Sequence, residues 1–82
     1  MFHRAKTLKF KRGTTIELTY MNGEKRRYDM GLMIDRYPFM WNLRNRKFFK
    51  SGELDPGGYG VIWSDDIDIS CEEVYANGKV VK

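Results

Sequence analysis

Apolar and polar residues alternate along the first third of the chain, and two glycines interrupt the alternation. Residues 7–11 and 14–20 each alternate with period two, which is typical of strands that bury one face. Residues 24–29 follow as a third predicted strand. The interruptions contain Gly13 and Gly23, which suit tight turns between neighbouring strands. The pattern therefore predicts an antiparallel meander of three strands.

The register of this meander follows from its turns. A three-residue loop that ends on a left-handed Gly23 pairs apolar residues with each other and joins opposite charges, whereas a two-residue loop mixes charge into the apolar face. The pairs it predicts are Thr15 with Asp29, Ile16 with Tyr28, Glu17 with Arg27, and Leu18 with Arg26. The same loop at Lys11-Arg12-Gly13 predicts the pairs Leu8 with Ile16 and Phe10 with Thr14. The expected core face consists of Leu8, Phe10, Ile16, Leu18 and Tyr28.

Short helical turns are predicted after the meander. Asp29 is the expected N-cap of a helix over residues 30–34. Pro38 is expected to begin a second helical turn, and Asn45 to cap a third. The apolar residues expected to cover the meander from these turns are Phe39, Met40, Leu43, Phe48 and Phe49.

The end of the chain predicts a hairpin and a final helix. Asp55-Pro56-Gly57-Gly58 is a strong turn sequence between two short strands. Ile67 and Ile69 are expected to be buried, and residues 70–73 fit a capping box that opens a helix ending at Asn77-Gly78. The predicted fold class is α+β: an antiparallel β-meander of three strands plus a later hairpin, covered by short helices. We expect a single domain over residues 1–82, with its core in 5–76 and a tail over 77–82 that either frays or adds an edge strand.

The composition argues against a disordered, membrane-spanning or secreted protein. The 82 residues are 41% hydrophobic and carry a net charge of +4, which suits a folded chain and permits an anionic partner. No apolar run approaches the roughly 20 residues that a membrane helix needs. A single cysteine and the polar start of the chain give no sign of secretion. We therefore expect a cytoplasmic protein that does not enter a membrane.

Few residues could support catalysis or hold a metal. His3 is the only histidine, and it lies near the start of the chain. Cys71 stands at the predicted start of the last helix, where a reactive thiol and a small buried core residue are the alternatives. The acidic residues around it fit a solvated turn and a helix cap better than a cation loop; they are Asp65, Asp66, Asp68, Glu72 and Glu73. We therefore expect no enzyme activity, no cofactor and no metal site.

Two sets of residues are candidates for contact with a partner. The predicted register gathers a basic face on the polar side of the meander, consisting of Lys9, Lys11, Lys25 and Arg27. An exposed charged face that keeps the protein in solution is the alternative interpretation. The large apolar residues Tyr59 and Trp63, together with Trp41, are candidates for an exposed aromatic patch. A second basic group consists of Arg44, Arg46, Lys47 and Lys50.

Four motifs, in this order and spacing, resemble a bacterial family known as domain of unknown function 2442. They are Asn22-Gly23-Glu24-Lys25-Arg26-Arg27-Tyr28-Asp29, residues 43–48, Gly58-Tyr59-Gly60-Val61-Ile62-Trp63, and Asp68-Ile69 with Val74-Tyr75. The family pattern usually has leucine where this chain has Val74. The resemblance implies a small α+β domain and brings no established activity. It also implies a gene pair suggestive of a toxin and its antitoxin, because members are often encoded beside another short protein.

The first functional hypothesis is a non-enzymatic interaction module, one partner of such a pair, which binds the product of the adjacent gene. The alternative is a nucleic-acid-binding or regulatory domain that uses the basic face. The sequence also leaves open a homo-oligomer.

Overall fold

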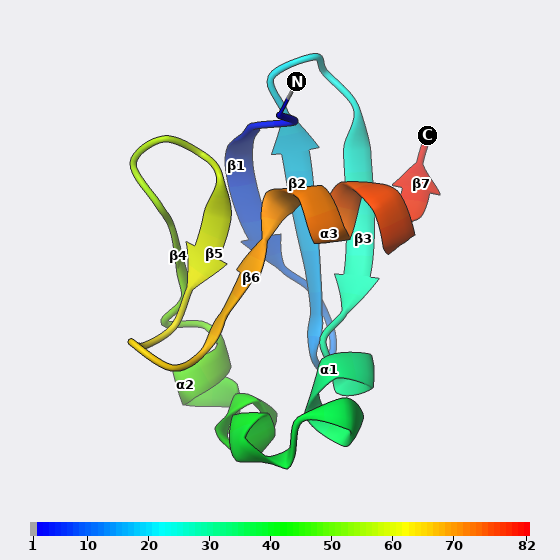
Figure 1. The fold of residues 1–82 in the computed structure, drawn as a ribbon. Helices are drawn as coiled ribbons and strands as arrows, with labels where there is room; N and C mark the ends of the chain where they lie inside the picture. The colour runs from blue at the N-terminus through cyan, green and yellow to red at the C-terminus, as the bar shows by residue number, and fades with distance from the viewer. Residues whose placement is uncertain (1) are drawn as a thin grey trace.

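The computed structural model describes residues 2–82, which form two antiparallel sheets and several short helices (Figure 1). Met1 lies outside the described residues. The larger sheet has the order β1-β2-β3-β7, with strands Ala5–Phe10, Thr15–Tyr20, Lys25–Asp29 and Lys79–Val81. The smaller sheet has the order β4-β5-β6, with strands Glu53–Leu54, Gly60–Ile62 and Asp68–Ser70. The helices are α1 (Gly31–Arg36), the 3-10 helix η1 (Pro38–Arg44), α2 (Arg46–Phe49) and α3 (Cys71–Asn77). The predicted α+β class, with its meander and later hairpin, is confirmed.

The predicted pairing of β2 with β3 is confirmed at every position. Thr15 lies opposite Asp29, Ile16 opposite Tyr28, Glu17 opposite Arg27, and Leu18 opposite Arg26. The turn between these strands ends on Gly23, whose φ of 89° is in the left-handed region that glycine tolerates. The aliphatic part of Arg26 is buried on the core face, and its guanidinium lies 4.2 Å from the centre of the Tyr75 ring.

The predicted pairing of β1 with β2 is wrong by two residues. The observed pairs are Leu8 with Leu18 and Phe10 with Ile16. The N–H of Lys11 donates to the carbonyl of Thr15 at 2.8 Å, so Gly13, with φ of 68°, stands in the middle of the loop and not at its end. A shift of two residues keeps every side chain on the same face of the strand. The expected core face therefore survives, although the partners differ.

The core lies between the larger sheet and the elements that cross it. In Figure 1, α3 passes in front of β2 and β3, while α1, η1 and α2 lie at the lower end of the sheet. The hydroxyl of Tyr20 donates to the backbone carbonyl of Cys71 at 2.7 Å, which ties β2 to the start of α3. Ile67 and Ile69 are buried as expected. The tail forms the edge strand β7, paired with β3.

Side-chain caps fix three of the helix starts. Asn45 accepts a hydrogen bond from the N–H of Phe48 at 3.0 Å, and Ser70 accepts one from the N–H of Glu73 at 3.0 Å, as the sequence predicts. The N-cap of α1 is Met30 and not Asp29. The Asp29 carboxylate nevertheless accepts from the N–H of Gly31 at 2.8 Å, so it caps this helix from one residue earlier.

The expectation that Phe39 packs beside Met40 and Leu43 is wrong. Met40 and Leu43 are buried, whereas Phe39 is exposed. The reason is that η1 is a 3-10 helix, in which residues three apart stand one above the other. Met40 and Leu43 therefore share the buried edge, and Phe39 lies on a different edge that faces solvent.

We expect acid to destabilise the β4–β5 hairpin through Asp55. Its carboxylate accepts hydrogen bonds from the N–H groups of Gly57 at 2.8 Å and Gly60 at 2.9 Å. The bond from Gly57 is the main reason that the pKa of Asp55 lies below its ordinary value. Because the pKa is depressed in the folded state, the stabilisation is fully present above the ordinary pKa of about 3.9. It is lost as the pH falls from there through the folded-state value.

Thermal unfolding at neutral and at acid pH measures this contribution. Asp55→Asn is expected to lower the midpoint at neutral pH and to reduce the loss on acidification, because the amide cannot ionise. Asp65→Asn is the matched control, since this carboxylate is exposed in the β5–β6 turn. If both variants showed the same pH dependence as the unmodified protein, Asp55 would not be an ionised loop cap.

Candidate functional site

The outer side of the larger sheet carries the predicted basic face. Lys9 lies opposite Glu17, which lies opposite Arg27, and Arg27 lies opposite Lys79 on β7, so one row crosses all the strands. Lys9, Arg27 and Lys79 are exposed, as is Lys25 in the neighbouring row, and Lys11 is half-buried at the end of β1. The structure therefore brings the four predicted cations to one face and adds Lys79.

A single carboxylate reduces the positive charge at the centre of this face. The Nε of Arg27 donates to Glu17 at 2.8 Å, and Glu17 is only 5% exposed. The hydrogen bond from Arg27 is the main reason that the pKa of Glu17 is lowered, against the opposing effect of burial. Glu17 therefore stays ionised in the middle of the face. Arg27 is already engaged, which leaves the lysines to meet an anion.

Of the three aromatic residues that are candidates for an exposed patch, Tyr59 and Trp41 are exposed and Trp63 is buried. Tyr59 is exposed, and the guanidinium of Arg4 lies 5.3 Å from its ring centre. Trp63 is only 8% exposed, so its assignment to a contact surface is wrong. Its Nε1 donates to the carbonyl of Phe49 at 2.7 Å, and the two rings stack. Gly52 makes room for the indole, because a Cβ there would lie 2.6 Å from Nε1.

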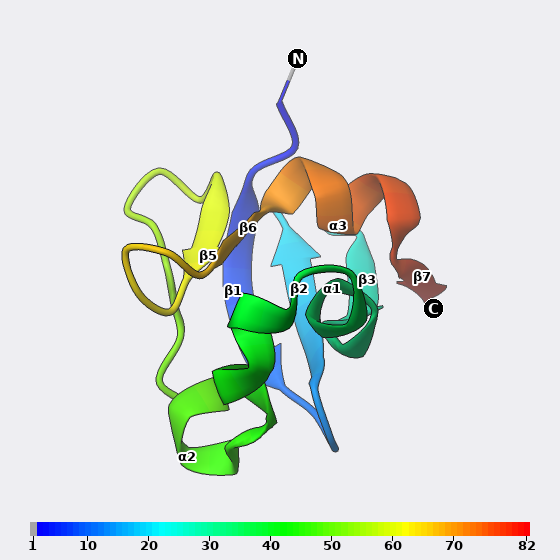
Figure 2. The same ribbon diagram turned by 60° about the horizontal axis from the view of Figure 1, so that its bottom comes forward.

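An exposed apolar surface lies on α1 and η1, and the sequence indicated only its Trp41 as a candidate for exposure. It consists of Leu32, Tyr37, Phe39 and Trp41, whose exposed fractions are 67%, 41%, 54% and 66%. We call these four residues the α1–η1 surface. The rings of Tyr37 and Phe39 lie 6.2 Å apart. Figure 2, in which the lower end of Figure 1 comes forward, shows α1 near the viewer with the green chain of η1 beside it. The three-residue period of η1 would have placed Trp41 and Phe39 off the buried edge.

A groove runs beside this surface, between α1 and α3. We call it the α1–α3 groove; its central cavity of about 440 Å³ is lined by Tyr28, Leu32, Met33, Arg36, Glu73 and Asn77. A cavity of about 510 Å³ continues it toward Lys79 and shares Tyr28 and Leu32 with it. A third, of about 270 Å³, continues it toward Tyr37 and Asp68 and shares Met33, Arg36 and Glu73 with it. Leu32 and Tyr37 therefore belong to both the groove and the exposed surface.

Some polar side chains that line the groove already have hydrogen-bond partners within the chain, whereas Arg36 has no ion-pair partner within residues 2–82. Glu73 accepts hydrogen bonds from the hydroxyl of Tyr28 at 3.2 Å and from the amide of Asn77 at 2.8 Å. Burial, and next the nearby Glu73 charge, raise the pKa of Tyr28, so its hydroxyl keeps its proton. Among residues 2–82, no ion pair engages Arg36. Arg36 is therefore a cation that lines the groove without an ion-pair partner in the described part of the chain, in a cavity that also contains the Glu73 carboxylate.

The stretch of chain that contains the α1–η1 surface is mostly positive in charge. Residues 31–50 contain five cations against one anion, a net charge of +4. Arg44 lies 3.4 Å from the carboxylate of Asp35. Arg46 donates to the backbone carbonyls of Lys11 and Gly13, each at 2.7 Å. Lys47 and Lys50 are exposed.

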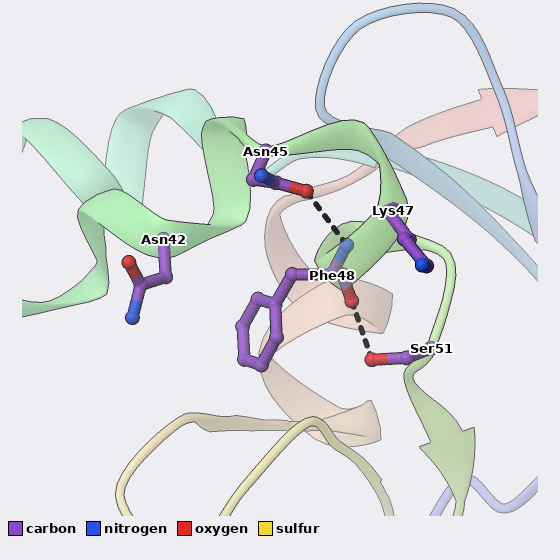
Figure 3. A pocket seen from close by; sticks show the side chains of 5 residues that line it. All are labelled: Asn42, Asn45, Lys47, Phe48 and Ser51. Atoms are coloured by element: carbon purple, nitrogen blue, oxygen red, sulfur yellow. Dashed lines mark hydrogen bonds between the residues drawn. The ribbon is translucent and has the colours of Figure 1, made fainter.

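A separate cavity beside α2 has little free polar chemistry. It measures about 430 Å³ and is lined by Asn42, Asn45, Lys47, Phe48 and Ser51 (Figure 3). As Figure 3 shows, Asn45 accepts from the N–H of Phe48, and the hydroxyl of Ser51 donates to the Phe48 carbonyl at 2.6 Å. These groups close the helix ends, so they are not available to hold a ligand.

The residues considered for catalysis also have structural partners. His3 is held against α3: its ring stacks on Tyr75 at 3.6 Å between centres, and its Nδ1 lies 3.1 Å from Glu72. Cys71 is fully buried, and burial raises the pKa of its thiol to about 11, so the thiolate form is disfavoured. Within residues 2–82, no three His, Cys, Asp or Glu side chains are grouped so that they could hold a metal ion. In the same residues, no helix has the length and apolar character to cross a membrane.

Comparison with known proteins identifies the family. Residues 5–80 match the family described as "Protein of unknown function (DUF2442)", which covers nearly the whole chain. No curated protein and no solved structure gives a significant match. The resemblance inferred from the four sequence motifs is thereby confirmed. The chain belongs to the DUF2442 family of proteins of unknown function.

Proposed function

We propose that this chain is a non-enzymatic interaction module that binds a partner protein through the α1–η1 surface. The observation that carries the proposal is the exposure of Phe39 and Trp41 on the same short 3-10 helix. Burying rings of this size on a partner releases much more free energy than it costs to order them, because their side chains have few torsions. Trp and Tyr are also the residues that most often dominate the energy of protein interfaces.

The proposed partner is the product of an adjacent gene, in a two-gene bacterial arrangement of the toxin and antitoxin kind. This part of the proposal rests on the family, whose members often occur in such pairs. The structure supports a protein partner in general. The exposed α1–η1 surface lies beside the α1–α3 groove, a shape that suits a folded partner or a segment of one.

Trp41→Ala is expected to weaken the complex with the adjacent gene product about 30-fold or more, because central aromatic residues typically contribute at least about 2 kcal/mol. The fold should be unaffected, since the indole is mostly in solvent. Co-purification followed by calorimetric titration measures binding, and circular dichroism verifies that the variant is folded. Phe2→Ala is the matched control, because Phe2 is an exposed ring near the opposite end of the molecule (Figure 1). The proposal fails if no complex forms at micromolar concentration, or if both variants bind alike.

Nucleic-acid binding through the basic face is a second candidate function. The observation that favours it is the row across the larger sheet in which Lys9, Arg27 and Lys79 lie on three of the four strands and one carboxylate lies on the fourth. Phosphate contacts lose affinity steeply as the salt concentration rises. A titration of duplex DNA and RNA at low and high salt, repeated with Lys9→Ala, separates this function from the first. If the affinity changed neither with the salt concentration nor with Lys9→Ala, nucleic-acid binding through the basic face would be excluded.

A further inference from the structure

We propose that the α1–η1 surface binds an acidic segment of a partner protein, whose apolar side chains enter the α1–α3 groove and whose carboxylate pairs with Arg36. This inference rests on the proposed function and specifies the chemistry of the partner. It follows from the composition of the groove, from the charge around it, and from which of those charges are already engaged.

The central cavity of the groove combines apolar side chains with one arginine and with Glu73, a carboxylate that already accepts hydrogen bonds from Tyr28 and Asn77. Leu32, Met33 and Tyr28 supply most of its hydrophobic lining, and Arg36 borders both the central cavity and the one that leads toward Tyr37. An arginine between apolar side chains can pair with a carboxylate through two parallel hydrogen bonds. The pair would be partly shielded from water, where such bonds are stronger than at an open surface.

The net positive charge of residues 31–50 disfavours a dimer in which a second copy of the chain covers this surface. A two-fold dimer brings the same surface of both copies together. Because residues 31–50 carry a net charge of +4, such a dimer would place two strongly positive rims in contact. Like charges opposed across an interface are unfavourable, whereas an acidic partner would be attracted.

Two arginines of this region already have partners within the chain, which disfavours the binding of a nucleic acid to this surface. Arg44 is held by Asp35, and Arg46 is held by two backbone carbonyls of the β1–β2 turn. The arginines nearest to Trp41 in the sequence are therefore not free to follow a phosphate backbone. Apart from these two arginines, the exposed cations of residues 31–50 are Arg36, Lys47 and Lys50, which no ion pair engages within residues 2–82, and charged residues outside an apolar centre are typical of protein interfaces.

A random peptide library displayed on phage and selected on the full chain tests the inference. We expect the enriched peptides to be acidic and to contain aromatic or aliphatic residues. Arg36→Glu should weaken a selected peptide about tenfold or more, since it replaces an attraction by a repulsion. Arg12→Glu is the matched control, because it changes the net charge equally but lies exposed in the β1–β2 turn. Circular dichroism of each variant verifies that it is folded.

Several outcomes would overturn the inference. These are the enrichment of neutral or basic peptides, equal effects of Arg36→Glu and Arg12→Glu, and displacement of the peptide by a single-stranded oligonucleotide. A dimer in light scattering that Trp41→Ala dissociates would assign the surface to a second copy. If the adjacent gene product binds in a Trp41-dependent manner but ignores Arg36→Glu, the proposed function stands and this inference fails. If acidic peptides bind as expected and the gene product does not, the choice of partner fails alone.

Discussion

Gly58→Ala is expected to lower the free energy of unfolding by about 3 kcal/mol, among the largest losses from any single methyl group in this chain. Two effects add. Gly58 has φ of 78°, and a left-handed conformation costs a residue other than glycine about 1–2 kcal/mol. A Cβ at this position would also lie 2.4 Å from the carbonyl oxygen of Ala5, which belongs to a strand and cannot easily move. Urea unfolding measures the loss.

The clash has a consequence for how the two sheets are joined. The N–H of Ala5 donates to the carbonyl of Gly58 at 2.7 Å, so the β4–β5 loop is fastened to the free edge of β1. Forcing Gly58 away from Ala5 breaks this connection. We therefore expect the amide of Ala5 to lose its protection from hydrogen exchange in the variant, together with the global loss of stability.

Gly13→Ala separates the two effects. Gly13 has φ of 68°, close to that of Gly58, but a Cβ there would meet no heavy atom within 4 Å. Only the conformational cost of about 1–2 kcal/mol should remain. Equal losses in the two variants would mean that the contact with Ala5 contributes nothing.

The two hairpin turns show how far the sequence could specify the register. Around Gly23, the correct loop pairs Glu17 with Arg27 and the alternative does not, so charge selects one answer. Around Gly13, the observed register pairs Lys9 with Glu17, whereas the predicted register places Lys9 opposite Thr15, so charge favours the observed loop here too. Pairings that differ by two residues bury the same side chains, so the hydrophobic pattern is satisfied by both. The hydrophobic pattern alone therefore could not place Gly13 in the middle of the loop, and the Lys9–Glu17 pair is the signal in the sequence that could have done so.

Less of the candidate site than of the sheet could be predicted from the sequence. Trp41 and Trp63 are the same residue type, and only their neighbours decide which is buried. Gly52 leaves space for Trp63, whereas η1 turns Trp41 into solvent. The α1–α3 groove joins residues near position 32 with residues near position 73, which only the tertiary structure brings together. The basic face could be predicted, because it depends on strand alternation alone.

Phe49→Ala is expected to cost about 3–5 kcal/mol, which is the typical range for deleting a buried phenylalanine side chain. Phe49 is fully buried, and its ring centre lies 5.1 Å from that of Phe10 and 6.1 Å from that of Trp63. Alanine would leave a cavity between α2 and both sheets. A domain of this size has a total stability of about 5–10 kcal/mol, so a substantial part of the population would be unfolded near the physiological temperature. Urea and thermal unfolding measure the effect.

Phe39→Ala is the matched control for Phe49→Ala, at a position ten residues earlier in the same helical region. It tests both the packing of the core and the binding of the partner protein. Phe39 is half in solvent, so its removal should change the free energy of unfolding by only about 0.5 kcal/mol. The same variant should weaken the complex with the partner protein, because Phe39 belongs to the α1–η1 surface. If Phe39→Ala destabilised the fold as much as Phe49→Ala, the ring would have to be packed in the core. The exposed surface on which the proposed function depends would then not exist. A variant that keeps its stability and loses its partner would instead show that Phe39 serves binding and contributes little to the fold.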